Sequence, residues 1–218
     1  MKTVRQNMAI AVVMIGMTCV CALAQDSFQE FSLSAHWLSP SRDTDWSSAS
    51  GVEAQVQFWH TRNTGMALAM GAETWNATDD VYEETGPSSY TYSAVGGDAS
   101  VTLLGVSALH RAELMEGLNI LMDAGIRWAF ISSNIRSDAV YEDAAGSTYV
   151  SDTIEIEDTV LAVVGVHLEG NLNENVSIRT GLSYRIDLSK PEETFIGESI
   201  GETSFQAVSF SVGVACAF

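Results

Sequence analysis

Apolar and polar side chains alternate with a period of two along most of this chain, and helical periodicity is almost absent. Over residues 176–187 the even positions hold Val, Ile, Thr, Leu, Tyr and Ile, while the odd positions hold Ser, Arg, Gly, Ser, Arg and Asp. Residues 52–58 and 118–130 repeat this alternation. Successive side chains of a strand point to opposite faces, so the pattern predicts β-strands with one apolar face.

The alternation predicts eight strands. They span residues 28–38, 51–60, 66–76, 96–107, 118–132, 158–170, 175–187 and 203–218. The fourth is ambiguous in phase, and the sixth is apolar on both faces for most of its length.

Long and short connections alternate between these strands. The short ones are predicted turns at residues 61–65, 108–117 and 171–175, with His110 in the second. In an up-and-down meander the odd connections lie at one end and the even ones at the other, so the long loops are expected to share one end. The predicted fold class is all-β, a closed antiparallel up-and-down barrel, with long loops on a single face.

The charges on the strands indicate which face meets the surroundings. One face carries Glu53, Glu73, Asp123, Arg127, His167, Arg179 and Arg185. The opposite face has almost no charge over the strand middles, which is typical of a transmembrane barrel with apolar residues toward lipid and polar residues inside. The three arginines and the carboxylates are therefore predicted to form a charge network in the lumen.

Pairing in this network is expected to run between strands. Asp123 and Arg127 share a face but lie about 13 Å apart along one strand. We therefore expect Arg127 to pair with Glu53 or Glu73. The sixth strand adds Leu161 and Val163 to the inside, and together these side chains are expected to plug the lumen.

Aromatic residues cluster near the predicted strand ends. One set is Trp37, Trp75, Trp128, Phe130 and Tyr184, and the other is Phe58, Trp59 and Phe218. Two aromatic girdles at opposite rims are typical of a barrel that crosses a membrane. The alternative is the general preference of strands for aromatic residues.

The N-terminal residues have the layout of a secretory signal peptide. Lys2 and Arg5 precede the apolar run 8–20, and Ala22 and Ala24 form a small-x-small cleavage site. The run is short for a spanning helix, which needs about 20 residues. We therefore predict a signal peptide at 1–24 and a barrel domain at 25–218. Only one of the three cysteines remains in that domain, so no disulfide is expected.

The C-terminal residues resemble the assembly signal of bacterial outer-membrane proteins. The pattern is carried by Ser211, Gly213, Cys216 and Phe218, with cysteine as an unusual apolar member. Together with the eight segments, the chain resembles the small eight-stranded barrels of the OmpA/OmpX type. The resemblance implies insertion by the barrel-assembly machinery, outer-membrane lipids around the barrel and extracellular long loops in a Gram-negative envelope.

No motif predicts catalysis or a cofactor. Lipid A deacylases use a His-x-Ser pair on one strand face, whereas His36 and Ser39 fall on opposite faces. The four histidines are scattered, which argues against a zinc site. There is no phosphate-binding loop and no EF-hand pattern. The sequence therefore predicts no enzyme, no bound metal in the barrel and no cofactor.

The chain is strongly acidic, with a formal net charge of −18, which excludes nucleic acid as a favoured partner. The long loops contain Asp43, Asp45, Asp79, Asp80, Glu83, Glu84, Asp138, Glu142, Asp143, Asp152, Glu155, Glu157, Glu192, Glu193, Glu198 and Glu202. These residues could bind divalent cations or repel anions, or simply form a solvated acidic surface.

The sequence thus predicts a small, monomeric outer-membrane barrel with a structural role or a binding role carried by exposed loops. Two alternatives remain open at this level. One is a narrow pore, and the other is a secreted, soluble, lipocalin-like barrel that binds an apolar ligand.

Overall fold

A computed structural model describes residues 28–218 apart from 43, 79–80, 85–88, 95 and 144–145. Eight antiparallel strands form a closed barrel in the order β1-β15-β12-β11-β7-β6-β3-β2. Their bounds are β1 Phe28–Pro40, β2 Trp46–Trp59, β3 Thr64–Ala77, β6 Asp98–Met115, β7 Leu118–Ser133, β11 Thr159–Asn171, β12 Val176–Asp187 and β15 Ala207–Ala217. No helix in the described part is long and apolar enough to cross a membrane. The predicted signal peptide at 1–24 lies outside the described residues.

All eight predicted barrel strands are confirmed, but some boundaries were wrong. Strand β2 begins at Trp46 rather than at residue 51, and β15 begins at Ala207 rather than at residue 203. The largest difference is in the fourth predicted strand. Strand β6 continues through residues 108–115, where a turn was expected, and His110 pairs with Met122 of β7. The alternation persists there, with Leu109 buried and His110 exposed. The turn itself is confined to residues 116–117, and Gly117 adopts a φ of 78°, which glycine tolerates without steric cost.

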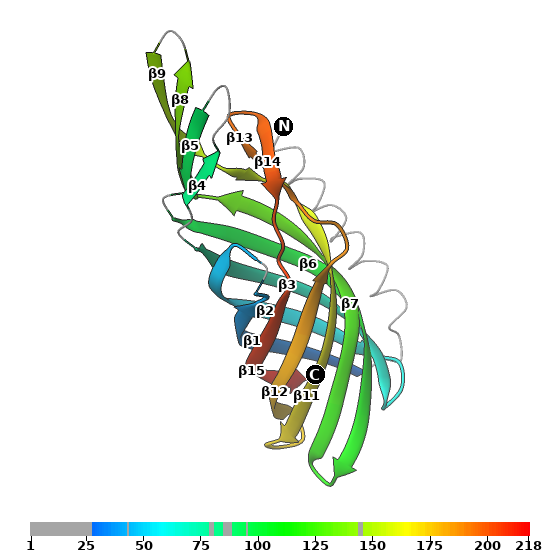
Figure 1. The fold of residues 1–218 in the computed structure, drawn as a ribbon. Helices are drawn as coiled ribbons and strands as arrows, with labels where there is room; N and C mark the ends of the chain where they lie inside the picture. The colour runs from blue at the N-terminus through cyan, green and yellow to red at the C-terminus, as the bar shows by residue number, and fades with distance from the viewer. Residues whose placement is uncertain (1–27, 43, 79–80, 85–88, 95, 144–145) are drawn as a thin grey trace.

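The long connections contain strands of their own, which the sequence analysis did not predict. Strands β4 (Val81–Glu84), β5 (Ser89–Ala94), β8 (Arg136–Asp143) and β9 (Gly146–Thr153) form a four-stranded sheet. Strands β10 (Glu155–Ile156), β13 (Glu192–Phe195) and β14 (Glu198–Glu202) form a second sheet. Both sheets lie beyond the same end of the barrel (Figure 1), hereafter the long-loop end. The opposite end is the short-turn end.

The first and last strands of the barrel close it. Leu33 pairs with Val214 and Phe31 with Cys216 along the β1–β15 seam. The backbone N–H of Phe218 donates to the carbonyl oxygen of Gln29 at 3.1 Å. Closure leaves the barrel strands without an unpaired edge, which is the condition for a β-structure to cross hydrocarbon.

The outer surface of the barrel is apolar. The large exposed side chains on the barrel strands include Phe31, Leu33, Trp37, Val52, Met66, Met70, Met122, Trp128, Val164, Val166, Leu168, Ile178, Leu182, Val208, Phe210, Val212 and Val214. They form an apolar band on the outside of a barrel whose interior is charged. This distribution is the inverse of that in a soluble barrel, where polar side chains face outward and apolar ones face inward. The chain is a transmembrane barrel, and the lipocalin-like interpretation is wrong.

Two tryptophans expected in the aromatic girdles lie inside the barrel instead. Trp59 is 2 % exposed and Trp75 is fully buried. Trp59 follows Phe58, and because adjacent strand residues point to opposite faces, only one of them can meet lipid. Trp37 and Phe210, by contrast, are exposed and stack across the β1–β15 seam at 6.2 Å between ring centroids.

Candidate functional site

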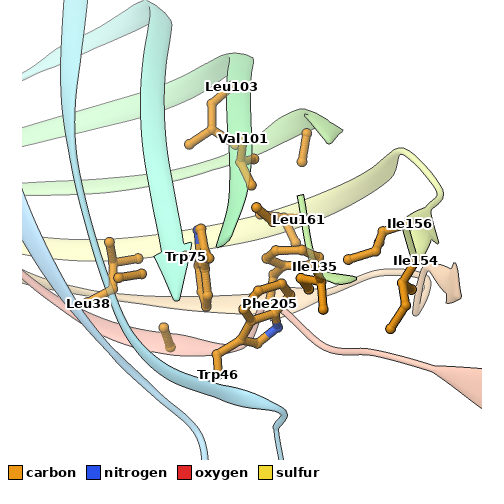
Figure 2. Packing of buried hydrophobic residues seen from close by; sticks show 14 of the residues in the cluster. Leu38, Trp46, Trp75, Val101, Leu103, Ile135, Ile154, Ile156, Leu161 and Phe205 are labelled. Atoms are coloured by element: carbon orange, nitrogen blue, oxygen red, sulfur yellow. The ribbon is translucent and has the colours of Figure 1, made fainter. Parts of the chain in front are cut away.

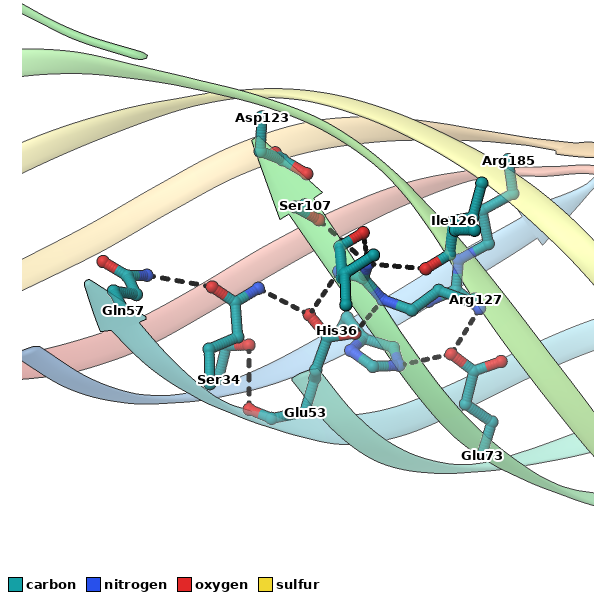
Figure 3. A network of polar contacts seen from close by, with 12 residues as sticks. Ser34, His36, Glu53, Gln57, Glu73, Ser107, Asp123, Ile126, Arg127 and Arg185 are labelled. Atoms are coloured by element: carbon teal, nitrogen blue, oxygen red, sulfur yellow. Dashed lines mark hydrogen bonds and ion pairs between the residues drawn. The ribbon is translucent and has the colours of Figure 1, made fainter. Parts of the chain in front are cut away.

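Charged and polar side chains from every strand of the barrel converge in its lumen. Figure 3 shows the part of this network near the middle of the barrel, where chains of hydrogen bonds and ion pairs cross between strands. The inward positions follow from the period of two, because each strand turns its charged face away from lipid. The lumen is the site to which the sequence assigned its charge network.

Arg127 of β7 is the centre of one cluster. Its Nε lies 3.0 Å from Oε2 of Glu53, and its Nη1 donates to Oγ of Ser107 at 2.9 Å. Gln55 donates to the other carboxylate oxygen of Glu53 at 2.7 Å. Of the two partners considered for Arg127, the structure places Glu53 in contact. The Arg127 side chain is only 2 % exposed, so water does not solvate its charge. The carboxylate of Glu53 therefore balances this buried charge.

Glu73 of β3 is the centre of a neighbouring cluster. Its Oε1 forms an ion pair with Arg185 and lies 2.8 Å from Nε2 of His36. Its Oε2 accepts a hydrogen bond from the Trp75 indole nitrogen at 2.9 Å. The buried carboxylate of Glu73 is therefore surrounded by Arg185, His36 and the indole N–H of Trp75. Each of its two oxygens has a polar partner, as a buried carboxylate requires.

A second ionic layer lies toward the short-turn end. Arg179 pairs with Glu30 at 2.6 Å and also with Glu169, while Arg111 pairs with Glu30 at 2.8 Å and with Glu169 at 2.9 Å. Arg111 also lies 4.0 Å above the ring of Trp59. Two guanidinium groups bridging two carboxylates form a closed four-residue network across the lumen.

Sequence reasoning missed three members of that layer. Glu30 and Glu169 share the inward faces of Ser32 and His167, so strand phase alone could have identified them. Arg111 was missed because residues 108–117 were taken for a turn. Asp123, which was assigned to the network without a partner, contacts His167.

A small cavity lies between the two ionic layers. It has a volume of about 40 Å³, and Ser32, Gln57, Asp123, His167 and Ser211 lie among its lining residues. His167 Nε2 is 2.9 Å from Asp123, and its Nδ1 is 3.5 Å from Oγ of Ser211. This order of groups resembles a hydrolytic triad, but a cavity of this volume has room for only a few water molecules, whereas ligand sites occupy about 300–1,000 Å³.

An apolar cluster lies toward the long-loop end of the barrel (Figure 2). Trp46, Trp75 and Phe205 contact one another with ring centroids 4.9–5.8 Å apart. Leu103 and Leu161 extend this cluster inside the barrel and are almost fully buried. The contacts of Trp75 with Trp46 and with Phe205 are edge-to-face, which is an arrangement that aromatic pairs favour.

Inward glycines make room for the charged side chains. A Cβ on Gly105 would lie 2.4 Å from Cδ of Arg127, and one on Gly181 would lie 2.2 Å from Nδ1 of His167. The interior of an eight-stranded barrel is only wide enough for side chains to fill it, so large groups need small ones beside them. The glycines are thus part of the network although they carry no charge.

The four residues of the predicted assembly signal divide between the two faces of β15. Cys216 and Phe218 are exposed on the outside, whereas Ser211 and Gly213 are partly buried on the inside. Their role in assembly stays a prediction. Within the described residues no three His, Cys, Asp or Glu side chains are grouped to hold a metal ion.

The apolar outer band, the closed eight-stranded barrel and the charged lumen together define a transmembrane β-barrel of the outer-membrane type. No family model and no curated protein matches the sequence. Among solved structures the chain is similar to the outer membrane protein OprG from Pseudomonas aeruginosa, with a TM-score of 0.53 and 8% identity over 88% of this chain and 96% of the other.

A major outer membrane protein from Thermus thermophilus is similar as well, with a TM-score of 0.50 and 15% identity over 87% of this chain and 99% of that one. At these identities the similarity shows the shared barrel fold. It also agrees with the predicted resemblance to small outer-membrane barrels.

Proposed function

We propose that this protein is a small outer-membrane barrel that presents its loop-borne sheets at the cell surface for binding, with a lumen closed to solute. The observation that carries the proposal is the contrast between the two parts of the molecule. The barrel interior carries ion pairs and an apolar cluster, whereas the long loops build two additional sheets beyond one end.

The composition of the loops supports a binding role. Five of the six tyrosines of the chain lie within residues 81–149, in and around the four-stranded sheet, among many Ser, Thr and Gly residues. Tyr provides large contact area at low entropic cost, and Ser and Gly adapt to a partner. The long loops therefore carry the residue types that binding surfaces favour.

Surface digestion of intact cells tests the placement of the loops. Trypsin has few sites there, so a protease of broad specificity such as proteinase K is suitable. We expect cleavage first within residues 138–157, while the barrel remains in the outer-membrane fraction. Recovery of the whole protein from the soluble periplasm or the medium without detergent would contradict the proposal.

Planar-bilayer recording tests the closed lumen and the alternative of a narrow pore. Because two ionic layers and the aromatic cluster lie in series, we expect little conductance from the purified protein. The cavity between those layers has a volume of about 40 Å³. A stable, frequent open state that persists in Arg127→Ala and Arg179→Ala would favour the pore instead.

A further inference from the structure

The hairpin formed by β13 and β14 has an unfavourable backbone conformation at its tip. Phe195 pairs with Glu198, so Ile196 and Gly197 form a two-residue turn. Ile196 has a φ of 53° and Gly197 a φ of 79°. Such a turn favours Asn-Gly, because both central residues need positive φ. A β-branched residue in this region is strained, and isoleucine is therefore a costly choice for the turn itself.

The second isoleucine of the hairpin also occupies an irregular position. The register shifts between Glu193 and Thr194, which pair with Gly201 and Ser199, so Ile200 has no partner on β13. Bulges of this kind change the direction of a side chain. Ile196 is 48% exposed and Ile200 is 41% exposed. Of the two exposed isoleucines, Ile196 thus lies in the strained turn and Ile200 lies at the register shift.

The surroundings of these two isoleucines are acidic and open. Residues 192–202 contain four glutamates and no Lys, Arg or His. All five residues of β14 are exposed, and no described strand pairs with its outer edge. A second copy of this chain would bring like charges together at the same place, which opposes self-association through this hairpin.

We propose that the β13–β14 hairpin is the principal binding element of the long loops, and that it takes a basic protein segment with apolar side chains. Ile196 and Ile200 insert as anchors, and the exposed Glu198 and Glu202 pair with the basic groups of the segment. The strain at Ile196 is retained because the residue contacts the partner rather than the barrel. This inference rests on the proposed surface function and assigns it to one hairpin.

The test uses the full-length barrel in nanodiscs of neutral phosphatidylcholine, with empty nanodiscs as the blank. The probe is an eleven-residue peptide of alternating Lys and Val, and a peptide of alternating Glu and Val is its charge-reversed counterpart. We expect binding of the Lys peptide, weakened by salt, and no binding of the Glu peptide. Equal binding of both peptides, or no binding of the Lys peptide, would overturn the inference.

The decisive variant is Ile196→Asn, because asparagine accepts this backbone conformation. We expect amide exchange in β13 and β14 to slow by about 5- to 30-fold, while affinity for the Lys peptide falls about tenfold. If Ile196 had a purely structural role, its replacement would change the stability of the hairpin and the affinity for the Lys peptide in the same direction. Faster exchange in the variant, or unchanged affinity, would show that the isoleucine is not a strained anchor.

Leu172→Asn is the matched control, because Leu172 is an aliphatic residue that is 64% exposed in the β11–β12 turn, at the opposite end of the barrel. We expect it to bind the Lys peptide as the natural protein does. A loss equal to that of Ile196→Asn would overturn the assignment of binding to the hairpin. Failure of the surface placement itself would appear separately in the protease experiment on cells.

Discussion

Gly105 of β6 pairs with Arg127 of β7, and the arginine side chain occupies the space that a side chain at position 105 would need. In Gly105→Ala the new Cβ would meet the carbonyl oxygen of Ile126 at 2.2 Å, and backbone cannot move aside as a flexible side chain does. We expect a loss of about 1–3 kcal/mol in the free energy of unfolding, measured by urea titration in lipid vesicles.

Gly170→Ala provides the control, since a Cβ there meets nothing within 4 Å. Its unfolding free energy should stay within about 0.5 kcal/mol of the natural protein. Equal destabilisation by both variants would mean that close approach of Arg127 is not what requires a glycine at position 105.

Arg127 itself is the second test at the residue scale. Arg127→Ala leaves Glu53 without its guanidinium partner inside the barrel, and breaking a buried pair in this way costs about 3–5 kcal/mol. The double variant with Glu53→Gln removes the orphaned charge and should recover part of the loss. Arg62→Ala, in the exposed β2–β3 turn, should have little effect. No recovery in the double variant would contradict the pairing.

At the scale of elements, the β10–β13–β14 sheet is expected to respond to pH through Glu193. Burial, and the nearby carboxylate of Asp45, raise the pKa of Glu193 to about 7. The folded sheet therefore holds a proton that the unfolded segment, with its ordinary carboxyl pKa near 4.5, releases. Stability contributed by this proton is complete below about pH 4.5 and is lost as the pH rises through 7.

Hydrogen exchange of the β13 and β14 amides at pH 5 and pH 8, corrected for intrinsic rates, measures this effect. We expect the free energy of local opening to fall by about 1–2 kcal/mol between these values, allowing for partial exposure of the carboxyl group. Glu193→Gln should abolish the dependence, while Glu198→Gln on the exposed strand should retain it. A slope that survives Glu193→Gln would assign the titration to another group.

At the scale of the whole molecule, we predict that Phe218 is needed for assembly of the barrel. Its side chain is 74% exposed on the outer face of the barrel, and its backbone N–H extends the β1–β15 seam. Deletion of Phe218 should greatly reduce the folded barrel in cells, seen as loss of the heat-modifiable band on gels. Phe218→Tyr keeps an aromatic terminus and should assemble. Normal folding of the deletion variant would show that the resemblance to the assembly signal has no role.

The sequence by itself determined the number of barrel strands, the alternation of their faces and the common end of the long loops, because a period of two is a local property of each strand. It also indicated that Glu53, Glu73, Arg127, Arg179 and Arg185 face inward. These conclusions need only the phase of each segment. The predicted strand boundaries failed where local signals were ambiguous. At residues 108–115 a turn was expected, but β6 continues to Met115 and the turn is confined to residues 116–117.

The tertiary structure alone decided which partners meet. Arg127 reaches Glu53 rather than Glu73 because shear between the strands sets the heights of inward side chains around the barrel, and no single segment encodes that offset. The same closure places Glu30 beside Arg179 although they are far apart in the chain. The loop sheets likewise depend on pairing between separate connections, such as β5 with β8, which only the closed barrel brings together.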